Sequence, residues 1–341
     1  MMFVAGALRR FFLANPTGSN MRNCAALSLF LACCANAGAG QNIAAPCVAG
    51  VSFWSLLGAL DVGYADGHLR ADKLYAVCLP APKAQSSSNY AYSPDEGGKL
   101  VSVVKGTDGQ VLDTLVWYAE NISGLWELSE YKVLGGVTKQ LAAGKYTLEF
   151  QVDGTPFYRF SFAVTTAPSD DPYQPAGTRY FIDGPWSEYG NIFYQRNDPE
   201  SSLRFTVWVQ DRVTHSQQKA ESYAAQLMRI RDGKIIGRDQ GELHSDQHWR
   251  QLDVLFHPAD GDAASYLKAK ELLHEDGAYR VRFERDGKPY GNYDFIVNGG
   301  KVQLKGRQLE ATEASTRIVD YLYGGRYRSW WLPRQNPATS N

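Results

Sequence analysis

The sequence predicts an all-β protein built from two copies of one folding unit, and three observations support this expectation. The motif Trp-Ser-x-x-Gly at Trp54 returns at Trp186, an offset of 132 residues. A denser pattern of Gly, aromatic and Asp-Gly positions in residues 144–164 returns in residues 277–297, at an offset of 133. Aromatic residues make up 13% of the chain, and strands favour such bulky side chains. Two clusters that keep their spacing to within one residue indicate duplication of a whole unit.

Size and charge limit the classes of protein that fit. A chain of 341 residues suits two domains and additional segments better than one core. The formal net charge of −1 and the pI near 6.6 provide no long-range attraction to nucleic acid or anionic membranes. We therefore expect no nucleic-acid partner.

The N-terminal segment has the order of a secretory signal. Met21-Arg22-Asn23 precedes the apolar run 24–35, and small-residue cleavage sites follow. The run is too short for a permanent membrane anchor, which predicts a signal peptide over residues 1–39 and a periplasmic or secreted protein without an integral membrane span. Translation could start at Met21, or Arg9-Arg10 could belong to a twin-arginine export motif. A lipoprotein site at Cys33 is a further alternative.

Cysteine usage agrees with export. Three of the five cysteines lie inside the signal, so the mature chain keeps Cys47 and Cys78. Two cysteines in an oxidising compartment most often pair. The predicted disulfide would stabilise the fold by roughly 3 to 4 kcal/mol in the loop-entropy model.

Strand patterns run through both copies. Apolar residues alternate from Tyr146 to Val152, Asp153-Gly154 provides a turn, and a second alternating run follows, which predicts a β-hairpin. The later copy repeats it around Asp286-Gly287. A short helix over 263–273, capped by Asp262, is expected before the second hairpin, and 217–228 fits a helix alone but a strand by comparison with the first copy. Further strands are expected at 74–79, 100–105, 203–209, 225–231 and 252–256.

The segments that lead into the two hairpins carry a resemblance. Leu141-x-x-Gly144-x-Tyr146 and Asp276-Gly277-x-Tyr279 resemble the tyrosine corner of immunoglobulin-like sandwiches, in which the Tyr hydroxyl bonds back to the preceding loop. The resemblance implies two tandem immunoglobulin-like antiparallel β-sandwich domains with a C-terminal extension. Leu148 and Val281 stand where true immunoglobulin domains have a cysteine, so the usual sheet-to-sheet disulfide is not expected.

Domain boundaries follow from the repeat and from proline content. A stretch with three prolines separates the copies and predicts a stiff linker. The C-terminal tail has no counterpart between the copies, and it could pack on the second domain or be free. The predicted order is signal peptide 1–39, first domain 41–165, linker 166–177, second domain 178–298 and aromatic, basic tail 299–341.

Catalytic chemistry is poorly represented. His244 and His248, with His257 further along, are the best metal candidates, but a third ligand at a recognised spacing is missing and surface histidines explain them more simply. The sequence contains no nucleophile elbow and no phosphate-binding glycine loop, so we expect no cofactor and no enzyme activity.

Two features could serve binding. The repeated tryptophans could stack on a sugar ring or anchor a partner, although buried core positions explain them as well. The tail interleaves arginines with aromatic residues. The candidate binding residues are Trp54, Trp186, Arg326, Arg328, Trp330 and Trp331.

These observations together predict an exported, non-catalytic binding or structural component of the cell envelope or exterior. Its expected partner is an envelope protein or a polysaccharide. A glycan-binding protein that uses exposed tryptophans is one alternative. A metal-assisted hydrolase that uses the three histidines is the other.

Overall fold

The computed structural model describes residues 49–83, 90–92, 98–122, 125–130, 139–169, 177–195, 197–212, 219–261, 264–303 and 327–336. Residues from Pro46 onward belong to one compact unit. The predicted signal, with its alternatives at Arg9-Arg10 and Cys33, lies outside the described residues. Within the described ranges no helix is long and apolar enough to cross a membrane.

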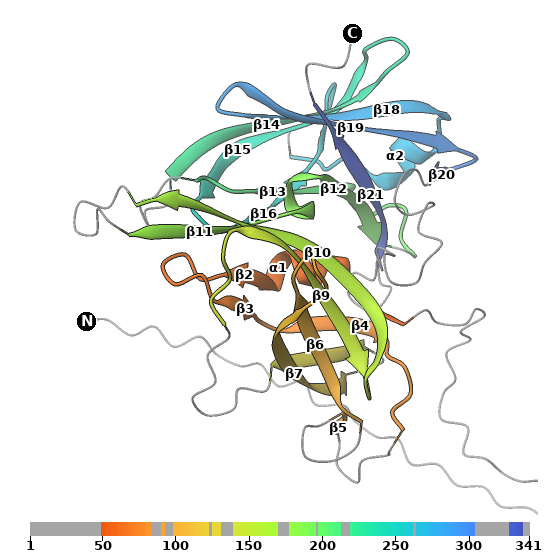
Figure 1. The fold of residues 1–341 in the computed structure, drawn as a ribbon. Coiled ribbons are helices and arrows are strands. Elements are labelled where there is room, and N and C mark those ends of the chain that lie inside the picture. Colours follow the sequence, from red (N-terminus) through yellow and green to blue (C-terminus); the bar gives the residue numbers. More distant parts are fainter. Residues whose placement is uncertain are drawn as a thin grey trace, which may run out of the picture. The chain divides into compact units, whose positions relative to one another are not determined.

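A first sheet of nine strands contains the earlier copy (Figure 1). Its order is β1-β4-β8-β7-β6-β9-β10-β11, with β5 on β7, and neighbouring strands are antiparallel. Helix α1 (Phe53–Ala59) and the small sheet of β2 (Leu60–Val62) and β3 (Leu69–Ala71) lie between β1 and β4 in the chain. The strands are β1 (Gly50–Val51), β4 (Leu74–Cys78), β5 (Tyr90–Tyr92), β6 (Leu100–Lys105), β7 (Val111–Ile122), β8 (Leu125–Glu130), β9 (Gly144–Val152), β10 (Thr155–Pro168) and β11 (Thr178–Asp183).

A second sheet of ten strands contains the later copy. Its order is β16-β13-β12-β21-β19-β18-β14-β15-β17, with β20 on β19, and Figure 1 shows β21 crossing beside β19 and β12. The short helices are η1 (Pro185–Ser187) and α2 (Ala269–Leu273). The strands are β12 (Tyr189–Gln195), β13 (Arg204–Val209), β14 (Lys219–Arg229), β15 (Ile235–Ser245), β16 (Arg250–Leu255), β17 (His257–Pro258), β18 (Gly277–Arg285), β19 (Lys288–Asn298), β20 (Lys301–Gln303) and β21 (Tyr327–Gln335).

The all-β antiparallel class is confirmed, but the pair of immunoglobulin-like sandwiches is not. The main sheet of each copy is continuous, because β7 pairs with both β6 and β8, and β21 pairs with both β12 and β19. These pairings join edges that would stay separate in two facing sheets. The ends of the second sheet, β16 and β17, are separated in the chain only by Phe256, so this sheet curls back toward its own start.

The duplicated pattern folds the same way twice. Asp153 and Asp286 both adopt a φ of 49° at the tips of the two hairpins. The hydroxyl of Tyr146 donates to the carbonyl oxygen of Ala142 at 2.7 Å, and that of Tyr279 donates to Glu275 at 2.8 Å. The tyrosine corners implied by the resemblance are therefore present in both copies.

Several local expectations differ from the structure. The segment 217–228 is strand β14 from Lys219 onward, not a helix. Helix α2 begins only at Ala269 with Lys268 at its N-cap, and Asp262 lies outside the described residues. Helix α1 was not expected, although Ser52 caps it by accepting from the Ser55 amide at 3.4 Å.

Strands also extend past the predicted segment boundaries. Strand β10 continues to Pro168, and β11, which begins at Thr178, pairs with it. The tail provides β21, so this part of the tail packs within the second sheet. The predicted division into domains stays a prediction.

The two tyrosine corners should contribute equally to stability. Tyr146→Phe and Tyr279→Phe each remove one hydrogen bond to a loop carbonyl, which should lower the free energy of unfolding by about 1 kcal/mol. Tyr266→Phe is the control, because Tyr266 is 49% exposed. Urea denaturation of the three variants measures the effect, and unchanged stability in both corner variants would show that these hydrogen bonds contribute nothing.

Candidate functional site

Both repeated tryptophans lie at the junction between the two sheets, and they have different partners. Trp186 is 1% exposed, and its indole N–H donates to the carbonyl oxygen of Leu57 at 2.7 Å. Its ring meets that of Phe160 edge-on at 5.6 Å. Trp249 stacks on the Trp186 ring at 6.3 Å, so Trp186 is a core residue without a ring face that is open to a ligand.

Trp54 points the opposite way, toward the second sheet, and it stays half-buried. Its ring lies 5.7 Å from Phe193, 5.1 Å from Trp208 and 6.0 Å from Trp331. Trp54 also lines a cleft. It is therefore the repeated tryptophan that combines a packing role with access to a ligand.

The tail residues are mostly used for packing. Trp331 is 2% exposed and stacks on Trp208 at 5.5 Å, and half-buried Trp330 stacks on Tyr194 at 5.7 Å. The backbone of Arg328 pairs with Tyr194, and Arg326 lies outside the described residues. Trp331 therefore lacks the open ring face that the sequence hypothesis requires, and Tyr194 covers one face of Trp330.

The cleft beside Trp54 has a volume of about 550 Å³, a size typical of small-ligand sites. One wall comes from α1 and its N-cap, and the other comes from β4, the end of β7 and the start of β8. The lining residues are Ser52, Trp54, Ser55, Gly58, Ala59, Asp72, Lys73, Tyr75, Ile122, Leu125 and Glu127.

Strand alternation puts polar side chains on the cleft side of the sheet. Leu74 and Ala76 of β4 are fully buried, so Tyr75 between them faces outward. In the register, Tyr75 lies opposite Glu127, which extends from the same outer face of β8. Neighbouring Leu128 is buried on the inner face.

A hydrogen-bonded ion pair forms the polar end of the cleft. The Lys73 ammonium lies 2.5 Å from Oε1 of Glu127, and the Tyr75 hydroxyl donates to Oε2 of Glu127 at 3.3 Å. The hydrogen bond to Glu127 raises the pKa of Lys73 above its ordinary value. The Glu127 side chain is 16% exposed whereas that of Lys73 is 57% exposed, so the carboxylate is fixed and the ammonium is accessible.

The serines of the cleft hold α1 in place. The Ser55 hydroxyl donates to the carbonyl oxygen of Ser52 at 2.8 Å and accepts from the amide of Tyr75 at 3.1 Å. These bonds tie α1 to β4, so the two walls of the cleft are connected through the backbone. The cleft is a preformed feature in which Asp72, Lys73 and Glu127 offer polar contacts.

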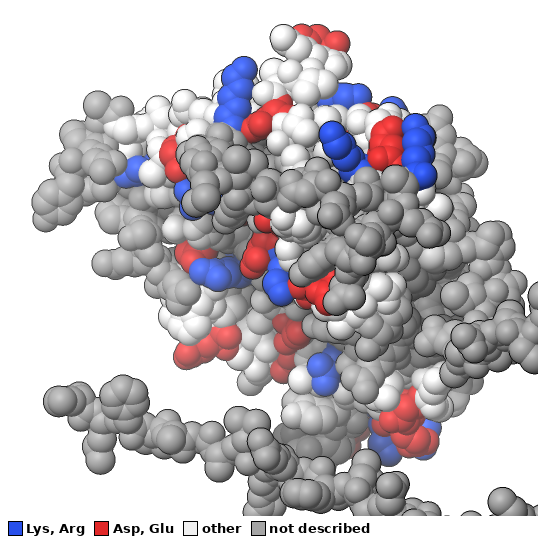
Figure 2. Space-filling view, turned by 90° about the horizontal axis from the view of Figure 1, so that it is seen from below, with Lys and Arg blue, Asp and Glu red and all other residues white. Residues whose placement is uncertain are grey.

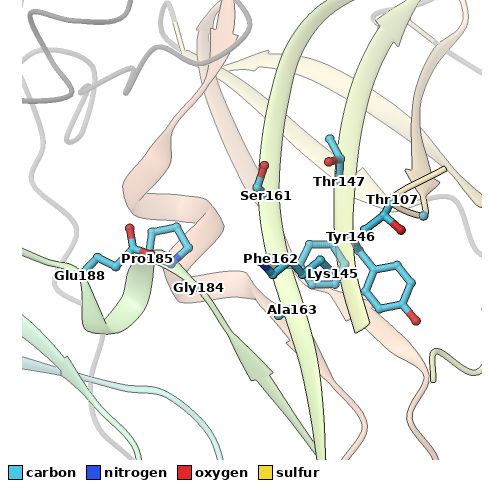
Figure 3. A pocket seen from close by; sticks show the side chains of 11 residues that line it. Thr107, Lys145, Tyr146, Thr147, Ser161, Phe162, Ala163, Gly184, Pro185 and Glu188 are labelled. Atoms are coloured by element: carbon cyan, nitrogen blue, oxygen red, sulfur yellow. The ribbon is translucent and has the colours of Figure 1, made fainter. Parts of the chain in front are cut away.

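A second groove of about 450 Å³ lies over β10, between η1 and β9 (Figure 3). Figure 3 shows Pro185 and Glu188 on one side and Lys145 and Thr147 on the other. Tyr146 also lines the groove, but its hydroxyl donates a hydrogen bond to the carbonyl oxygen of Ala142. We favour the cleft at Trp54, because there a large aromatic ring and an ion pair with a fixed carboxylate occur together.

The three candidate metal-binding histidines are not brought together. His244 is exposed on β15, and Nδ1 of His257 lies 2.9 Å from the carbonyl oxygen of Ser265. Nδ1 of His248 lies 2.5 Å from Oδ2 of Asp61. Within the described part of the chain, no group of three or more His, Cys, Asp or Glu side chains is placed to hold a metal ion. The geometry gives no support to the metal-assisted hydrolase.

The structure describes one of the two cysteines of the predicted disulfide. Cys78 closes β4 and pairs with Gly50 of β1 in the register. Cys47 lies outside the described residues, so the Cys47–Cys78 bond stays a prediction.

Charge on the surface is mixed in sign. Figure 2 shows acidic and basic side chains close to one another on the face that it presents. This agrees with the near-zero net charge and with recognition by local contacts rather than by a long-range field.

Comparison with known proteins finds no matching family model and no similar curated protein. The chemistry of the site therefore rests on its own residues. Sequence reasoning included Trp54 but missed Lys73, Tyr75 and Glu127. Alternation in the predicted strand 74–79 could have shown that Tyr75 faces outward, but its proximity to Glu127 depends on a strand register that the sequence does not reveal.

The contact of His248 with Asp61 should make stability depend on pH. The hydrogen bond that the His248 imidazolium donates to Asp61 raises the pKa of His248, and nearby Asp246 adds to this effect while burial and Arg250 oppose it. A raised pKa in the folded state means that the stabilisation is complete below the unfolded value of about 6.5. It is lost as the pH rises through the folded pKa.

We therefore expect the free energy of unfolding to fall as the pH is raised from about 6.5 through the folded pKa of His248, and to fall less in His248→Gln. Urea denaturation across this range measures the slope. His244→Gln, at an exposed position on β15, should keep the wild-type slope. Identical slopes in all three proteins would exclude this source of pH dependence.

Proposed function

We propose that this protein is an exported, non-catalytic binding component of the cell envelope or exterior, and that the cleft beside Trp54 binds a saccharide. The observation that carries the proposal is the combination, in one cleft, of a large aromatic ring with the fixed donors and acceptors around Glu127. Each sugar hydroxyl both donates and accepts hydrogen bonds, and the C–H faces of a sugar pack on aromatic rings.

The balance of charge favours a neutral ligand. Asp72 and Glu127 are acceptors, whereas the Lys73 ammonium is a donor whose charge offsets one carboxylate. The Lys73 ammonium would repel a strongly cationic ligand, and the carboxylates of Asp72 and Glu127 would repel a strongly anionic one. A hydroxyl-rich ligand can use all three groups at once.

The apolar part of the cleft adds to this match. Ile122 and Leu125 flank the polar groups, and Ile122 is 47% exposed. An exposed isoleucine beside an aromatic ring provides surface on which an apolar ligand face can pack. The proposed partner is thus a polysaccharide rather than an envelope protein.

Binding should depend on the Glu127 carboxylate. Glu127→Gln keeps the size of the side chain but removes the charge that orients Lys73, and Lys73→Met removes the donor. Because hydrogen bonds to charged groups are worth roughly 1.5 to 3 kcal/mol, each change should weaken affinity by about 10- to 100-fold. Affinity electrophoresis through gels that contain dextran, hydroxyethyl cellulose or galactomannan measures retardation of each protein.

Glu242→Gln is the matched control, because Glu242 is an exposed carboxylate on β15, far along the chain from the cleft. Its retardation should equal that of the wild type, and thermal melts should show that all variants are folded. The proposal fails if the wild type migrates freely in all three gels, or if folded Glu127→Gln is retarded as strongly as the wild type.

A further inference from the structure

We infer that the site continues across the outer face of β7 and β8, and that it binds an internal stretch of a glycan chain rather than a single sugar unit. This inference rests on the proposed function. It starts from a second cavity of about 280 Å³, which is lined by Tyr118, Glu120, Glu127 and Ser129. Glu127 lines both this cavity and the cleft beside Trp54.

The strand register explains why the two cavities adjoin. Ile122 lies opposite Leu125, Glu120 lies opposite Glu127, and Tyr118 lies opposite Ser129. Side chains two residues apart extend from the same face of a strand. These three cross-strand pairs therefore form three successive rows on one outer face of the sheet.

The inner face of the same strands belongs to the core. Trp117, Ala119 and Leu128 alternate with the groove residues and are each 0% exposed. Their burial fixes the register, because a shift by one residue would turn these apolar side chains outward. The rows of the groove are thus held in place by the packing beneath them.

The length of the groove exceeds one sugar ring. From the row of Ile122 to the row of Tyr118 is four residues along β7, which spans about 13 Å at roughly 3.3 Å per residue. Trp54 lines the cleft at one end, the Lys73–Glu127 pair lies at the middle row, where the two cavities adjoin, and Tyr118 and Ser129 lie at the other end. Both ends carry an aromatic side chain next to hydrogen-bonding groups, the pattern expected for successive rings of one chain.

Glu120 contributes an exposed carboxylate to the second cavity. It lies directly opposite Glu127, and like charges in this position cost stability. Glu127 is neutralised by Lys73, and Glu120 is exposed. An exposed carboxylate between Tyr118 and Glu127 is placed to accept hydrogen bonds from the hydroxyls of the next ring.

Dependence of affinity on chain length tests the inference. Isothermal titration calorimetry with isomalto-, cello- and manno-oligosaccharides of two, four and six rings should show about tenfold tighter binding of the longest member in at least one series. In Glu120→Gln and Ser129→Phe this gain should shrink to about twofold or less, while affinity for the two-ring member stays at the wild-type value. That retained affinity also shows that the variants are folded.

Thr114→Phe is the steric control, because it adds the same bulk to an exposed position of β7 away from both cavities. It should keep the full gain with length. Equal affinity for two and six rings overturns the inference and leaves the proposed function intact. A six-ring ligand that fails to bind also overturns it when the polysaccharide of that series retards the protein. A wild type that neither binds an oligosaccharide nor is retarded in any gel overturns both.

Discussion

The contact on which the rest of the structure depends is the reciprocal packing of the two repeated tryptophans at the junction of the sheets. Trp186 donates its indole N–H to Leu57 of the first copy, and Trp54 packs against Trp208 and Trp331 of the second. Burial of Trp186 removes roughly 150 to 250 Å² from water, or about 4 to 6 kcal/mol of gross hydrophobic stabilisation, and half-buried Trp54 contributes less. Trp249 stacks on Trp186 and donates to the carbonyl oxygen of Ile182, so side chains of both copies pack in one shared core at the junction.

The candidate site is a consequence of that junction. Trp54 of α1 packs against Trp208 of the second sheet, which fixes the position of α1 beside β4. The cleft lies between α1 and β4. The groups that line its other wall are set by strand alternation and by the register of β4, β8 and β7. The cleft thus combines one residue whose position depends on the second sheet with others that depend on the first sheet alone. Disruption of the junction should therefore move the aromatic wall before it moves Glu127.

The sequence predicts the local structure of this chain, namely its hairpins and most of its strands. It does not predict which distant strands pair with one another. Both Asp-Gly hairpins and most strands follow from period-two alternation and turn chemistry, which act within about ten residues. The two tyrosine corners were implied by the resemblance to immunoglobulin-like sandwiches. The curled sheets depend on pairings such as β21 with β12, between residues more than a hundred positions apart. Trp54 was predicted as a binding residue because its motif repeats. Lys73 and Glu127 are 54 residues apart and belong to no motif or repeat that would indicate a site. At Trp186 the structure shows the buried packing position that the sequence also allowed, because duplication preserves packing residues as faithfully as ligand contacts.

The place of β21 in the second sheet also bears on how the chain acquires its structure. This strand lies between β12 and β19, so the strands made earlier cannot close the sheet before residues 327–335 are available. Trp331 belongs to β21 and stacks on Trp208 at the junction. The shared core is therefore incomplete until β21 has been synthesised. Contacts between such distant segments slow folding, because the loop must close before any pairing is gained. The second half of this protein should consequently fold only after synthesis of β21, rather than in stages as the chain is made.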